Sequence, residues 1–219
     1  MGKVPQSILD SILAFPPNRE TLGGTAYLIV GNDGNTLVDC PAWDDRTQGV
    51  LADQGGVARL ILTHRDGMSP QVAQMQDCLG CEVIIQEQEA YLLPGVTVTA
   101  FRQEMGVPPY FRVIWTPGYS PGSACLYYSL LGGVLFSGRH LLPNPQGDLG
   151  PLRTAKTFHW LRQLRSVEQL RSQFSATTLS YLCPGANLGY LRGQRVITQA
   201  YEVLQHLDLV LLGLSRPLC

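Results

Sequence analysis

The chain has 219 residues, of which 45% are hydrophobic and 15% are charged. Its 16 basic and 17 acidic residues give a formal net charge of −1, which excludes a protein that binds nucleic acid through its overall charge. The sequence contains no apolar run long enough for a membrane span, and its length favours a single domain over residues 1–219.

The first half of the chain alternates short apolar runs with helix signals. A short amphipathic stretch over 8–13 comes first. Runs of β-branched and apolar residues then predict strands at 26–30, 36–39, 59–62 and 83–85. Acidic residues at 44–45 and Pro70 each open a predicted helix, and glycines at 55–56 and 80 end them.

The second half is richer in strands before it returns to helices. Strands are predicted at 96–100, 112–115, 125–128, 134–137 and 179–182. A long helix is expected from Thr154, which is a suitable cap, and a last helix over 196–210 has apolar residues at helical spacing. The pattern as a whole predicts a mixed α/β protein.

Four predicted strands end in loops that are rich in turn-forming and polar residues. These loops span 62–69, 115–123, 135–139 and 182–187. The second of them reads Thr-Pro-Gly-Tyr-Ser-Pro-Gly-Ser from Thr116 to Ser123. Because loops at strand ends are where binding and catalytic side chains gather, we expect these loops to assemble a site.

The order and spacing of these loops resemble the metallo-β-lactamase superfamily. The family writes T-P-G-H-T-P-G-S where this chain has residues 116–123, and the resemblance extends from Asp39 to Ala186. It implies an α/β fold of four layers, the αββα sandwich. It also implies ions of zinc, iron or manganese that activate a water molecule for hydrolysis.

Most of the metal ligands that the resemblance implies are replaced in this chain. The family signature T-H-x-H-x-D-H falls on residues 63–69, and the later ligands fall in the other loops. The vestigial metal positions are His64, Asp66, Met68, Ser69, Tyr119, Arg139 and Ala186. Only His64 keeps a ligand of the family, and Asp66 is the one substitute ligand. Since Arg139 places a permanent positive charge where the family has a bridging carboxylate, we expect no metal and no other cofactor.

Two hypotheses follow for the loops that hold the vestigial metal positions. In the first, Asp66 and Arg139 form an ion pair that replaces the metal as a link between the two halves. In the second, His140, Cys183 or Asp39 completes a different metal site with His64.

The expected function is that of a pseudoenzyme, a non-catalytic binding or assembly module whose partner is a protein or a second copy. The low charged fraction supports a surface that is partly covered. One alternative is a diverged hydrolase of esters, thioesters or phosphodiesters, with His64, Asp66 and Tyr119 as the catalytic residues. Another is a redox-responsive protein that acts through Cys78 and Cys81, which form a C-x-x-C motif.

Further expectations concern location, the cysteines and the aromatic residues. The chain start has no hydrophobic signal core, so a cytoplasmic location is expected, with most of the six cysteines reduced and buried. The aromatic residues Phe101, Tyr110, Phe111 and Trp115 predict either a contact surface or ordinary sheet core.

Overall fold

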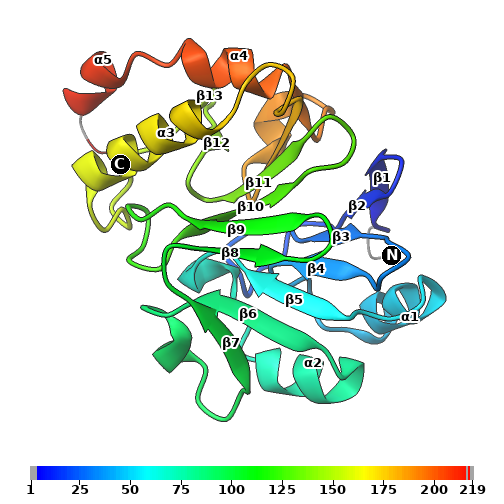
Figure 1. Ribbon diagram of the computed structural model, residues 1–219. Helices are drawn as coiled ribbons and strands as arrows, with labels where there is room; N and C mark the ends of the chain where they lie inside the picture. Colours follow the sequence, from blue (N-terminus) through cyan, green and yellow to red (C-terminus); the bar gives the residue numbers. More distant parts are fainter. Residues whose placement is uncertain (1–3, 216, 218–219) are drawn as a thin grey trace.

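Two β-sheets pack face to face, with helices on the outer face of each, in the computed structural model (Figure 1). The structure describes residues 4–215 and 217. Among these residues no helix is both long enough and apolar enough to cross a membrane.

The first sheet holds seven strands in the order in which they occur along the chain. Its strands are β1 (Gln6–Leu9), β2 (Ile12–Ala14), β3 (Tyr27–Ile29), β4 (Thr36–Val38), β5 (Arg59–Leu62), β6 (Glu82–Gln86) and β7 (Val98–Phe101). Strands β1 to β4 pair antiparallel, and β4 to β7 pair parallel. Because α1 (Asp45–Asp53) and α2 (Val72–Leu79) lie in the crossovers between parallel strands, they cover the outer face of this sheet.

The second sheet has the strand order β15-β14-β11-β10-β9-β8. Its strands are β8 (Glu104–Val107), β9 (Phe111–Trp115), β10 (Ala124–Tyr128), β11 (Val134–Gly138), β14 (Tyr181–Pro184) and β15 (Ile197–Thr198). A small separate pair joins β12 (Leu142–Pro143) to β13 (Leu149–Gly150). The outer face is covered by α3 (Trp160–Gln173) and α4 (Ala200–Gln205), and α5 (Leu209–Gly213) packs on α3.

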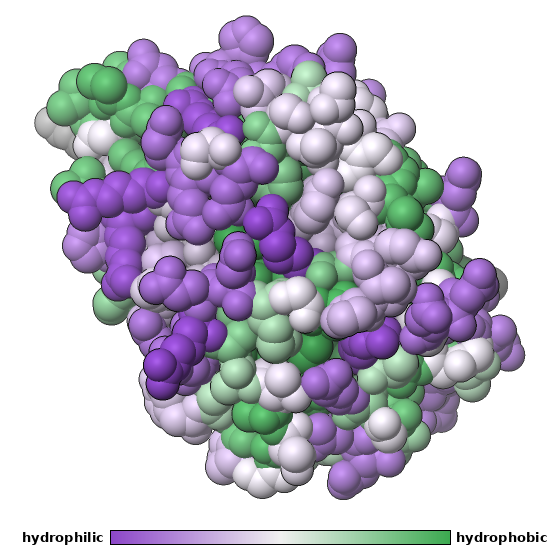
Figure 2. Space-filling model, viewed as in Figure 1, coloured by the Kyte–Doolittle hydropathy of each residue, from purple (hydrophilic) through white to green (hydrophobic). Residues whose placement is uncertain are grey.

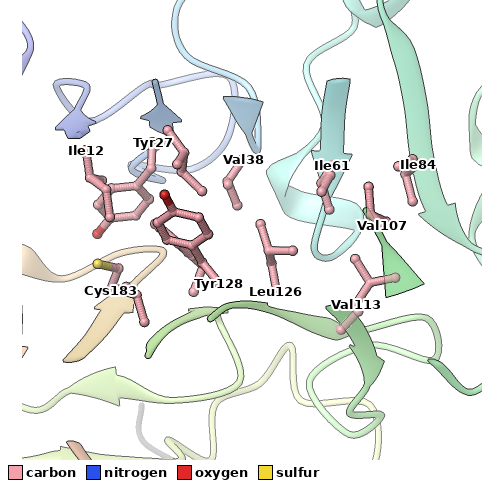
Figure 3. Close-up of a cluster of buried hydrophobic side chains, with 14 of the residues drawn as sticks. Ile12, Tyr27, Val38, Ile61, Ile84, Val107, Val113, Leu126, Tyr128 and Cys183 are labelled. Atoms are coloured by element: carbon pink, nitrogen blue, oxygen red, sulfur yellow. The ribbon is translucent and has the colours of Figure 1, made fainter. Parts of the chain in front are cut away.

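Three apolar layers hold the sandwich together. The central layer lies between the two sheets and includes Ile12, Tyr27, Leu126 and Cys183 (Figure 3). The other two layers lie between each sheet and its helices. The hydroxyl of Tyr27 donates to the carbonyl of Pro184 at 2.6 Å, so the first sheet is also hydrogen-bonded to the second across 157 residues of sequence.

Most sequence-predicted elements are confirmed, including both early helices. Asp44 caps α1 by accepting from the Thr47 amide at 2.8 Å, and Gly80 ends α2 in the left-handed region at φ 62°. The amphipathic stretch at 8–13 is part of a hairpin formed by β1 and β2. Strand β8 is an element that the sequence pattern does not predict.

Two helix predictions are wrong in their bounds. Helix α3 begins at Trp160 rather than near Thr154, because Thr154 and Thr157 close a separate turn and His159 supplies the cap. The single helix predicted over 196–210 is divided into β15, α4 and α5. Asp208 accepts from the Leu211 amide and so starts a new helix inside the apolar pattern.

Candidate functional site

The loop residues that the sequence singled out meet at one end of the sandwich. His64 and Asp66 follow β5, Tyr119 lies in the turn after β9, and Arg139 follows β11. The rings of His64 and Tyr119 meet edge to face at 5.3 Å, and the Arg139 guanidinium lies 6.0 Å from the Tyr119 ring. The Tyr119 hydroxyl donates to a carboxylate oxygen of Asp66.

His64 is oriented by a chain of hydrogen bonds that begins at Asp39. The amide and the hydroxyl of Thr63 donate to the Asp39 carboxylate at 2.8 and 2.7 Å, and Nδ1 of His64 lies 2.8 Å from the same hydroxyl oxygen. Because the hydroxyl hydrogen is directed to the carboxylate, we assign the proton of His64 to Nδ1, which donates to Thr63 Oγ1. The lone pair of His64 is therefore on Nε2, which is buried and has no hydrogen-bond partner among the described residues.

Burial controls the protonation of this chain of hydrogen bonds. The pKa of His64 falls from 6.5 to about 3, first because burial penalises the charged ring and then because Arg139 is near. Burial raises the pKa of Asp39 to about 6, against the opposing effect of its bonds from Thr63. At pH 7 His64 is neutral and Asp39 is ionised, which is the state that the hydrogen bonds require.

Close backbone approach makes this arrangement tight. A Cβ at Gly138, where φ is 50°, would lie 2.4 Å from Thr63 Oγ1, and a Cβ at Gly67 would lie 2.5 Å from an oxygen of Asp39. Glycine is therefore required at both loops for Asp39, Thr63 and His64 to hold their places.

Arg139 binds the N-terminal half of the chain, but not through Asp66. Its Nη2 atom donates to the carbonyl oxygens of Thr21 at 3.1 Å and Leu22 at 2.7 Å. Among the described residues, the ion-pair partner of Asp66 is Lys156 at 3.8 Å, and Tyr119 takes its other oxygen. The predicted Asp66–Arg139 ion pair is therefore wrong, because each group has a nearer partner that satisfies it.

The remaining vestigial positions serve packing and local hydrogen bonds. Met68 is half-buried against the core beneath α1 and α2, and Ala186 is buried. Ser69 is buried as well, and its hydroxyl donates to Glu20 and accepts from the Gln71 amide. None of the three offers the imidazole, thiolate or carboxylate group by which proteins bind zinc.

The cysteines of the described chain are all free thiols, and Cys219 lies outside the described residues. Cys78 is exposed, whereas Cys81 is buried, and burial raises the pKa of the Cys81 thiol. A raised pKa disfavours the thiolate that redox chemistry needs. Cys183, an alternative metal ligand, points into the core between the sheets (Figure 3).

His140, the other alternative ligand, is buried, and neither ring nitrogen has a hydrogen-bond partner in the part of the chain that the structure describes. Burial lowers its pKa to about 3. The backbone carbonyl of His140 accepts from the side-chain amide Nε2 of Gln163, on α3, at 2.8 Å, which fixes this turn against the helix.

The donor set does not fit the metal that the resemblance implies. The lone pair of His64 Nε2 is free to bind a metal, but both oxygens of Asp66 are engaged by Tyr119 and Lys156. Within the described part of the chain, no group of three or more His, Cys, Asp or Glu side chains is placed to hold a metal ion. The guanidinium of Arg139 adds positive charge beside His64, which opposes a cation there.

Sequence reasoning missed three sets of contacts at this end. Lys156 pairs with Asp66, the carbonyls of Thr21 and Leu22 hold Arg139, and fully buried Glu89 pairs with Arg65 at 3.1 Å and accepts from the Gly122 amide. No motif marks a lysine or a carbonyl as a partner, and Glu89 ends the polar run Gln86-Glu87-Gln88-Glu89, so the sequence carries no signal of its burial either.

Solved structures of known proteins share this architecture. The metallo-β-lactamase family protein TTHA1429 from Thermus thermophilus matches with a TM-score of 0.65 and 20% identity, over 94% of this chain and 81% of that one. TTHA1623 in a di-iron-bound form matches with a TM-score of 0.63 and 21% identity, over 86% and 96%. A metallo-β-lactamase from Staphylococcus aureus subsp. aureus COL matches with a TM-score of 0.69 and 16% identity, over 98% and 69%.

The chain therefore has the fold of the metallo-β-lactamase superfamily, and the predicted αββα sandwich is confirmed. No protein-family model matches the sequence, and the search of curated proteins finds no match.

Proposed function

We propose that this protein is a metal-independent, non-catalytic binding or assembly module built on the metallo-β-lactamase fold. The observation that carries the proposal is the placement of Arg139. Its guanidinium stands where the resemblance puts a bridging carboxylate, and it is fixed there by the carbonyls of Thr21 and Leu22. The Arg139 side chain thus joins the loop after β11 to the segment between β2 and β3.

The protonation states of the remaining polar groups support the same proposal. His64, with a pKa of about 3, is a weak base. Burial and the bond to Asp66 raise the pKa of Tyr119, which makes its hydroxyl a weak acid. The hydrolase alternative needs His64 and Tyr119, together with Asp66, to act on a substrate, and the pKa directions of His64 and Tyr119 oppose proton exchange by those two groups.

The partner that we propose is a protein, either a different chain or a second copy of this one, in the cytoplasm. The outer end of the molecule exposes apolar side chains on and beside α5, where Val210 is 81% and Leu214 is 80% exposed (Figure 2). Apolar side chains gathered in this way are typical of a surface that another protein covers.

Metal content tests the proposal. The full chain and a His64→Ala variant are incubated with excess zinc, manganese and iron(II), desalted, and measured for bound metal. Less than about a tenth of an equivalent in both supports the proposal. A near-stoichiometric ion that is lost in His64→Ala would overturn it.

Activity and assembly complete the test. The same proteins are assayed with a p-nitrophenyl ester, a thioester and a p-nitrophenyl phosphodiester. Hydrolysis that His64→Ala abolishes would establish the hydrolase alternative. Light scattering of the purified chain over a range of concentrations then shows whether the partner is a second copy.

A further inference from the structure

A polar cleft lies behind the Thr116–Ser123 turn, on the face of the molecule that α3 covers. The α3 cleft, as we call it, is lined chiefly by Gln103, Trp115, His159, Arg162, Arg165 and Gln169. Its volume is about 520 Å³, within the usual range for small-molecule sites. Among the described residues, neither His64 nor Tyr119 lines this cleft. The carbonyls of Gly118 and Tyr119 accept from the amides of His159 and Phe158, respectively, which attaches the turn to the segment before α3.

The lining carries positive charge without a compensating acid. Arg162 and Arg165 have no acidic partner within ion-pair distance in the described part of the chain, and the cleft lining holds no Asp or Glu. Nearby, Arg112 pairs with Glu104 at 3.3 Å and Arg171 pairs with Glu168 at 3.1 Å. Arg162 and Arg165 are three positions apart on α3, and both guanidinium groups line the same cleft.

The side chains of Arg162 and His159 are held in place by local contacts. The Arg162 guanidinium lies 4.8 Å from the Trp115 ring, and the Trp115 indole N–H donates to the Pro121 carbonyl at 2.9 Å. His159 Nδ1 accepts from the Arg162 amide at 3.2 Å, so its ring hydrogen is on Nε2, and this exposed ring is free to donate.

We propose that the α3 cleft binds the phosphate group of a small phosphate monoester. Two guanidinium groups, an imidazole N–H and the amides of Gln103 and Gln169 supply donors around one cavity, and guanidinium groups match phosphate oxygens in paired hydrogen bonds. The indole of Trp115 gives the cleft an aromatic wall for the organic part of the ligand. This site is separate from the vestigial metal positions and does not depend on the function proposed above.

Isothermal titration calorimetry of the full chain at low ionic strength tests the proposal. The probes are AMP, glucose 6-phosphate and inorganic phosphate, with adenosine as the uncharged control. Binding of AMP but not of glucose 6-phosphate or adenosine supports a site for a nucleotide. Equal binding of both esters supports recognition of the phosphate alone, and no binding of any probe at millimolar concentration overturns the proposal.

Variants locate the site. Arg162→Gln and Arg165→Gln are each expected to weaken binding of the tightest probe about tenfold. Arg59→Gln removes the same charge at a distant strand start, where its guanidinium contacts the Asp33 carbonyl, and is expected to leave affinity unchanged. Thermal melting confirms that each variant folds. Affinity that is unchanged in Arg162→Gln and Arg165→Gln, or lowered equally by Arg59→Gln, overturns the proposal.

Discussion

Arginine is used differently in two regions that lie on opposite sides of one turn. At the vestigial metal positions, Arg139 donates to two backbone carbonyls and stands beside Tyr119. In the α3 cleft, Arg162 and Arg165 meet no acid among the described residues. A cation whose hydrogen bonds are made within the fold contributes to stability, whereas one left facing solvent is available to a ligand. The two regions therefore predict separable effects on stability and on binding.

The largest expected effect is on stability at Arg139. Arg139→Ala removes donors from two carbonyls and is expected to lower the free energy of unfolding by about 3 kcal/mol. Arg165→Ala, at an exposed side chain, is expected to change it by less than about 0.5 kcal/mol. Urea unfolding followed by tryptophan fluorescence measures the free energy of unfolding of both variants. Equal losses would contradict the different roles of Arg139 and Arg165.

The next effect concerns acid. Below pH 6.5 the unfolded chain protonates His64 and His140, whereas their folded pKa of about 3 delays this, so stability is lost as pH falls. Asp39 has the opposite effect and offsets the contribution of one histidine. Its pKa is about 6 in the folded chain against the ordinary 3.8, so between these values the folded chain binds a proton that the unfolded chain does not. The net loss between pH 6 and 4 is about 1.4 kcal/mol per pH unit.

The control for the acid effect is a histidine variant. His140→Gln removes one of the two histidines that bind a proton only in the unfolded chain. The contributions of His64 and Asp39 then cancel, so the free energy of unfolding of this variant is expected to be nearly independent of pH between 6 and 4. Urea unfolding at a series of pH values gives both slopes. A slope in His140→Gln as steep as the parent's would show that His140 is not held neutral.

A smaller effect is expected at the Tyr119–Asp66 hydrogen bond. Tyr119→Phe and Asp66→Asn are each expected to cost about 1 to 2 kcal/mol, since each removes or weakens one charge-assisted bond. The double variant is expected to cost less than the sum, because both changes affect the same bond. Additive losses in urea unfolding would mean that the two side chains act independently.

The smallest effect is expected at Lys156. Its ion pair with Asp66 spans 3.8 Å, and the lysine is 57% exposed. Lys156→Gln is therefore expected to change the free energy of unfolding by less than about 0.5 kcal/mol. A loss as large as that of Tyr119→Phe would show that Lys156 contributes as much as Tyr119 to holding Asp66.

Local signals account for what the sequence predicts well. The cap residues Asp44 and Gly80 act within a few positions of themselves, so α1 and α2 lie nearly where the pattern predicts them. The turn at Thr116–Ser123 likewise indicates the place of the site. The late helix is overestimated because its apolar spacing continues past Asp208, where a side-chain cap begins a new segment.

The partners of the site side chains cannot be predicted in the same way. Arg139 binds carbonyls that are 118 and 117 residues away, and any residue type supplies a carbonyl. The expected Asp66–Arg139 pair follows from charge alone and ignores that Tyr119 is closer to Asp66. Charges of opposite sign on facing loops indicate proximity, but the backbone and neutral hydroxyls compete for them.

The bond from Tyr27 to Pro184 bears on how the chain folds during synthesis. Tyr27 is made early, but the carbonyl that it binds follows 157 residues later, at the end of β14. Contacts of such separation form late, because a long loop must close before they stabilise the chain. A growing chain therefore has its first sheet complete in sequence while the inner face still lacks the cover of β14, and premature termination before Pro184 leaves that face open to aggregation.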